Sequence, residues 1–196
     1  MLFSKIFTGI TMAATAMAAA TPQQIASGIA SLTQKSQALQ APAQSITILN
    51  APLIVIGQGP FPTIIAGFAD IVSTANALIA QLPGSAPIAR GEKQHARDLS
   101  IRGPDADLVF STFREFVRVH QALLNILIGK AGILSKIPVI GQPVATALRG
   151  VEGVVDSIAI STINLLQVHS NDVASDANSL GNTIDLAIKS YDSIGA

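Results

Sequence analysis

The sequence contains no cysteine, and this absence removes two common sources of stability. A chain without thiols has neither disulfide bonds nor cysteine metal ligands, so the packing of apolar side chains must hold the fold together. The chain also lacks any Asn-x-Ser/Thr acceptor, so N-glycosylation is not expected. Its formal net charge is zero, and nucleic acid is therefore a poor candidate partner, because binding phosphates requires an excess of basic residues.

Charge is especially scarce in one third of the chain. Between residues 20 and 90 only Lys35 and Asp70 are charged, while apolar residues recur at helical spacing. The uncharged run 44–69 requires that a transmembrane helix be considered, but glycine and proline at 57–62 cut it below the roughly 20 residues that a span requires. We therefore expect no transmembrane span and a partner of apolar chemistry.

The first 20 residues are typical of a secretory signal peptide. Lys5 provides a short basic region, residues 6–17 an apolar run, and residues 18–20 the small side chains that signal peptidase accepts. The alternative is a buried or membrane-anchoring N-terminal helix, but the apolar run is shorter than a span, and Thr21 and Pro22 then start a new helix. We therefore expect a secreted, extracellular protein whose mature chain begins at Thr21 and which is either held in the cell wall or released. Residues 21–196 should then form one domain.

The periodicity predicts an all-α protein, an antiparallel bundle of four or five long amphipathic helices with short broken helices. The apolar stripes lie in residues 25–39, 64–82, 110–134, 144–165 and 173–191. No stretch alternates as a strand does. Thr21, Pro22 and Gln24 predict a capping box at the first helix, which should end near Pro42.

Three other segments interrupt this pattern. Residues 46–56 are apolar but broken at Pro52, which indicates a short or broken helix. Gly129, Gly132 and the segment 138–143, which has a proline at each end, indicate a break before the next helix. Residues 83–104 have no periodicity and mix basic with acidic residues, so we expect an exposed charged loop. A solvated linker is favoured there over a partner-binding patch or a processing site, because opposite charges are interspersed.

Residues suited to catalysis or metal binding are not grouped in the sequence. His95, His120 and His169 are far apart and lack the companion ligands of a zinc site. There is no Walker loop, dinucleotide fingerprint or nucleophile elbow. Two pairs of aspartates lie at predicted helix starts, Asp105 with Asp107 and Asp172 with Asp176. Compensation of the helix dipole explains both pairs without an acid–base role. We expect no enzymatic activity, no cofactor and no metal.

Two long stretches carry a resemblance to known proteins. These are TQKSQALQAPAQSITILNAPLIVIGQGPFPTIIAGFADIV, residues 33–72, and FREFVRVHQALLNILIGKAGILSKIPVIGQPVATALRGVEGVVDSIA, residues 113–159. They resemble small secreted fungal proteins described as ultraviolet-inducible. In its layout of signal peptide and cysteine-free helices, the chain is also similar to fungal hydrophobic-surface-binding proteins and lipid-binding cell-wall mannoproteins. That layout implies burial of a fatty acyl chain between helices or adsorption to a waxy surface.

The residues and the resemblance together lead to two functional hypotheses. One is a lipid-binding or hydrophobic-surface-binding protein, whose partner is a fatty acid or an apolar surface. The other is a cell-wall-associated or host-interacting structural protein without a small ligand, in which every stripe faces the bundle core. In the first case the apolar stripes should line the ligand cavity through Phe68, Ile71, Phe113, Val117 and Leu124. A contact to the carboxylate of a lipid headgroup would then come from Arg114, Arg118 or His120 at the cavity mouth.

Overall fold

Over the residues that the structure describes, the protein is a bundle of five long helices and two short ones. The computed structural model describes residues 20–82, 103–134 and 140–194. Its elements are α1 (Pro22–Ala38), α2 (Gln40–Gln44), η1 (Ala51–Ile56), α3 (Pro60–Ile79), α4 (Pro104–Leu134), α5 (Gly141–Leu165) and α6 (Ser170–Asp192). No strand occurs in these ranges, and the all-α prediction is confirmed. Nearly all of the expected signal peptide and charged loop lie outside the described residues.

The first helix begins with the interactions that its sequence predicts. The backbone N–H of Gln24 donates to Thr21 Oγ1 at 3.2 Å, and the backbone N–H of Thr21 donates to Gln24 Oε1 at 2.8 Å. This reciprocal pair satisfies two donors that would otherwise lack a partner at the helix start. Helix α1 ends at Ala38, and Pro42 lies inside the short helix α2, where the first turn tolerates a proline.

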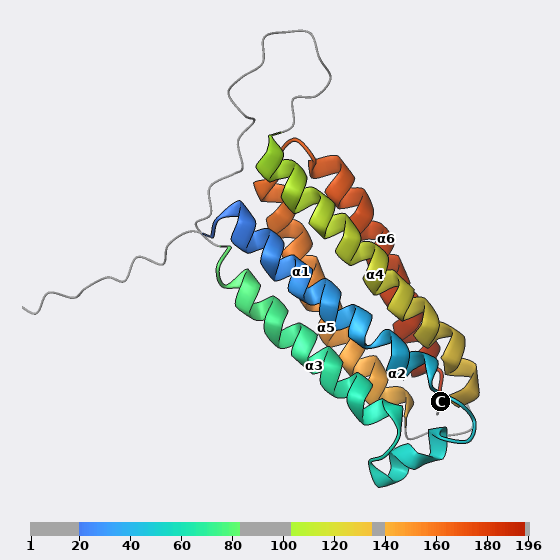
Figure 1. Cartoon of the computed structure of the whole chain (residues 1–196). Helices are drawn as coiled ribbons and strands as arrows, with labels where there is room; N and C mark the ends of the chain where they lie inside the picture. Colours follow the sequence, from blue (N-terminus) through green and yellow to red (C-terminus); the bar gives the residue numbers. More distant parts are fainter. Residues whose placement is uncertain (1–19, 83–102, 135–139, 195–196) are drawn as a thin grey trace, which may run out of the picture.

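The helices pack around one core, with consecutive long helices running in opposite directions (Figure 1). Neighbours that are distant in sequence can nevertheless be parallel. Gln23 bonds Asp105 at 2.9 Å, and Ser36 bonds His120 at 2.8 Å, so α1 and α4 advance in the same direction. Hydrophobic periodicity does not carry this information, since a buried stripe fits a parallel or an antiparallel neighbour.

Helix α4 includes the two glycines at which the predicted break starts. It continues through Gly129 and Gly132 to Leu134, and α5 begins at Gly141, within the predicted break segment 138–143. A helical glycine costs about 1 kcal/mol relative to alanine. Here burial of Leu127, Ala131 and Leu134 in the core offsets that cost.

Helix α3 is the one helix in the described part of the chain that is long and apolar enough to cross a membrane. Its most apolar window has a mean hydropathy of 1.4. One face of α3, including Ile64, Phe68 and Ile71, is buried against α1 and α5. The buried face belongs to the bundle core, while the opposite face is exposed.

Candidate functional site

The five apolar residues expected to line a ligand cavity are all part of the core. Phe68 and Ile71 on α3, and Phe113, Val117 and Leu124 on α4, are at most 5% exposed. None of them lines either of the two grooves described below. The structure therefore brings these residues together as neighbours in a packed interior.

His120 is one of the few polar residues inside that interior. Ser36 donates its hydroxyl proton to the Leu32 carbonyl at 2.9 Å, which leaves the hydroxyl oxygen to accept from His120 Nδ1 at 2.8 Å. The imidazole packs near the rings of Phe68 and Phe116, and its Nε2 atom has no hydrogen-bond partner. Burial lowers the pKa of His120 to about 4, so the ring is neutral at neutral pH. A buried neutral histidine is not a headgroup contact.

The two arginines expected to contact a headgroup lie on the surface and face different partners. Arg114 Nε donates to Asp176 Oδ2 of α6 at 3.0 Å, and its guanidinium lies 4.5 Å from the centre of the Phe110 ring. Arg118 pairs with Glu115 one turn earlier on the same helix. Their side chains are 56% and 69% exposed. Together with buried His120, they do not converge on a shared site.

A second polar cluster joins the starts of α4 and α6. His169, directly before α6, is fully buried, and its Nε2 lies 2.9 Å from Asp107 Oδ1. Its ring stacks on Phe110 with the ring centres 4.2 Å apart. Asp107 therefore does more than compensate the helix dipole, because it also links the two helices. No group of histidine and carboxylate residues in ranges 20–82, 103–134 and 140–194 could hold a metal ion.

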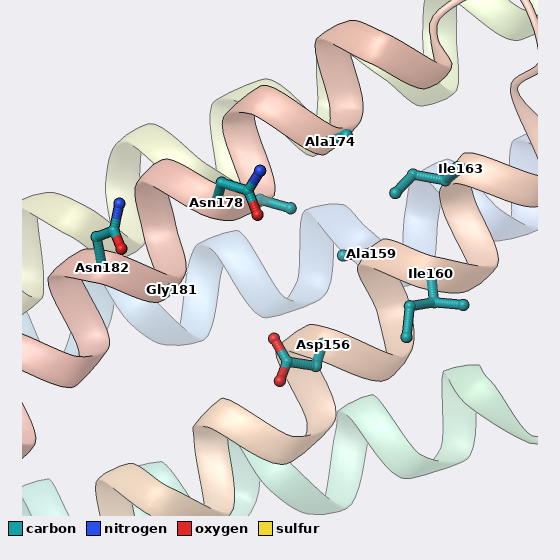
Figure 2. Close-up of a pocket in the computed structure, with 9 residues that line it drawn as sticks. Asp156, Ala159, Ile160, Ile163, Ala174, Asn178, Gly181 and Asn182 are labelled. Atoms are coloured by element: carbon teal, nitrogen blue, oxygen red, sulfur yellow. The ribbon is translucent and has the colours of Figure 1, made fainter.

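Two surface grooves run between neighbouring helices. The first, about 310 Å³, lies between α5 and α6, where Figure 2 shows Ile160 and Ile163 toward one end and Asp156 and Asn182 toward the other. The second, about 330 Å³, lies between α1 and α4 and is lined largely by polar side chains. Both are open to solvent, so neither encloses an acyl chain.

The most exposed apolar side chains gather in one segment. We call residues 46–59 the apolar tip; it contains η1 and protrudes beyond the helix ends at the bottom of Figure 1. Leu49 is 90% exposed, Ile48 74% and Ile56 66%, and Leu53 is also exposed. The tip carries no charged residue. A cluster of this kind is unusual on a protein surface and typically marks an interaction site.

Hydrogen bonds within the tip satisfy many of its own polar groups. Thr47 N donates to Asn50 Oδ1 at 2.8 Å, and Asn50 N donates to Thr47 Oγ1 at 3.3 Å. Asn50 Nδ2 also donates to the Ser45 carbonyl at 2.7 Å, and Gln58 N donates to the Leu53 carbonyl at 2.9 Å. The tip thus presents apolar side chains on a backbone whose polar groups are partly paired, which lowers the cost of removing it from water.

The sequence contains a feature that indicates the exposure of the tip, although the helical periodicity analysis does not use it. The segment is apolar and uncharged, yet Pro52 and the glycines that follow prevent a long helix. Gly57 and Gly59 have φ values of 72° and 84°, in the region that glycine favours. A segment too broken to bury its side chains by helix packing is a candidate for exposure.

Comparisons with known proteins assign no function to the apolar tip. No protein-family model matches the chain, and a search of the curated proteins finds no match. The functional inference therefore depends on the arrangement of the chain's own residues.

Proposed function

We propose that this protein is a secreted, non-enzymatic helical protein that adsorbs to apolar surfaces through its tip. The observation that carries the proposal is the cluster of Ile48, Leu49 and Ile56, all more than half exposed, on an uncharged protruding segment. Of the two forms of the lipid-binding hypothesis, this favours adsorption over internal binding of a fatty acid, because the candidate lining residues pack together in the core and line neither of the two grooves.

The size of the exposed cluster suits reversible adsorption. Full burial of a leucine or isoleucine side chain contributes about 1.5–3 kcal/mol, so three partly exposed ones contribute on the order of 5 kcal/mol. This is similar to the binding of a single myristoyl chain, which gives reversible membrane association. The resemblance in layout to hydrophobic-surface-binding proteins points in the same direction.

Adsorption to an octadecyl-coated surface tests the proposal. The double variant Leu49→Ser, Ile56→Ser should lose most of the adsorption of the wild type, because it removes two of the most exposed tip side chains. A matched control replaces two apolar residues exposed elsewhere, Ile160→Ser with Leu186→Ser, which are 61% and 53% exposed. The control should adsorb as the wild type does.

Two outcomes would contradict the proposal. If both double variants lose adsorption to the same extent, then apolar side chains anywhere on the surface, and not the tip in particular, drive adsorption. No adsorption by the wild type would favour the structural alternative, a wall-associated or host-interacting protein without an apolar ligand.

A further inference from the structure

The charged side chains toward the C-terminal end of α6, the end near the tip, form ion pairs. Asp185 pairs with Lys189 one turn later, and Asp192 pairs with Arg149 of α5.

Among the residues that the structure describes, Lys130 contacts the root of the tip. It lies one turn before the end of α4, and its Nζ atom donates to the Ile46 carbonyl at 2.9 Å. An ammonium group has three protons, so this bond leaves two for other acceptors. No carboxylate within the described ranges lies within ion-pair distance of Lys130. A positive charge without a carboxylate partner in these ranges is therefore bonded to the first residue of the apolar tip.

We propose that the surface bound by the tip is a bilayer containing anionic phospholipid, which the bundle meets end-on with Lys130 at the level of the lipid phosphates. This inference rests on the proposed function, since it specifies the surface to which the tip adsorbs. An apolar cluster backed by a cation matches the layering of a bilayer, whose hydrocarbon lies beneath a shell of phosphates. A wax or alkane surface offers no partner for the ammonium group.

The test compares partitioning into vesicles of phosphatidylglycerol mixed with phosphatidylcholine and into vesicles of phosphatidylcholine alone. Lys130→Gln should weaken binding to the anionic vesicles about five-fold, the effect of about 1 kcal/mol for one basic residue near such a surface. It should leave adsorption to octadecyl surfaces unchanged. Lys130→Arg, which keeps the charge and a donor for Ile46, should restore binding to the anionic vesicles.

Lys35→Gln provides the matched control for net charge. Lys35 pairs with Asp70 midway along the bundle, so its removal changes the total charge equally but away from the tip. If both Gln variants bind anionic vesicles equally well, or if the wild type does not distinguish the two vesicles, the inference is overturned.

Ionic strength tests the same point without mutation, in case Lys130→Gln fails to fold. Raising the salt concentration from about 0.01 to 0.5 M should bring the binding of the wild type to anionic vesicles close to its binding to neutral ones, because screening shortens the electrostatic range. If the wild type still prefers anionic over neutral vesicles to the same extent at high salt, the inference is contradicted. Absence of adsorption to vesicles and octadecyl surfaces alike would instead reject the proposed function itself.

Discussion

Two groups of apolar side chains in this protein have opposite surroundings. Those of the bundle interior, such as Phe68 and Phe113, are fully buried, whereas Leu49 and Ile56 of the tip face solvent. The difference follows from local structure, because long amphipathic helices can turn one face toward their neighbours and a short broken segment cannot. Apolar content alone therefore does not distinguish side chains that hold the fold together from those available to a partner.

The largest expected effect comes from the interior. Phe113→Ala should lower the free energy of unfolding by about 3–5 kcal/mol, because a buried phenylalanine leaves a cavity when it is truncated. Urea unfolding of the wild type and the variant measures this loss. Adsorption of the folded variant through the tip should be unchanged. A much smaller loss of stability, together with saturable fatty-acid binding by the wild type, would show that the interior holds a ligand.

A second effect in the interior depends on pH. The pKa of His120 is about 4 in the folded protein, whereas an unfolded histidine has a pKa of about 6.5. Between pH 6.5 and pH 4 this histidine is protonated in the unfolded chain but neutral in the folded protein. The free energy of unfolding therefore falls as the pH is lowered from 6.5 to 4. Below pH 4 the histidine is protonated in both states and lowers the free energy of unfolding no further. The difference of about 2.5 pKa units corresponds to about 3 kcal/mol.

Urea unfolding at pH 7 and pH 4 checks this effect. The variant His120→Leu should lose about 3 kcal/mol less than the wild type over that interval. In the variant Ser36 keeps its bond to the Leu32 carbonyl, so removal of the imidazole does not leave the hydroxyl without a partner. Parallel pH profiles for the two proteins would show that His120 is accessible to protons in the folded state.

The smallest expected effect on stability comes from the tip. Leu49→Ser and Ile56→Ser should each change the free energy of unfolding by no more than about 0.5 kcal/mol, since exposed side chains lose little packing when replaced. The same urea experiment measures this change. A loss above about 2 kcal/mol would mean that the tip belongs to the folded core, and the contrast between the two groups would fail.

The apolar spacing was sufficient to predict the helices. Helix α1 begins at the predicted capping box, and α4 begins at Pro104 behind the predicted acidic first turn. These features depend on contacts within three or four residues, which the sequence contains directly. The helix continues through Gly129 and Gly132, the first residues of the predicted break, because burial of neighbouring residues, a tertiary effect, outweighed the low helix propensity of glycine.

The sequence by itself therefore determined the helical class, the helix starts and the faces that would be apolar. Tertiary structure decided which helices run parallel and that Ser36 and His120 form a hydrogen bond inside the core. It also decided that Lys130 bonds the Ile46 carbonyl at the start of the apolar tip. The physical reason is distance along the chain. Ser36 and His120 are 84 residues apart, as are Ile46 and Lys130, and only packing of the whole bundle brings such pairs within hydrogen-bond range.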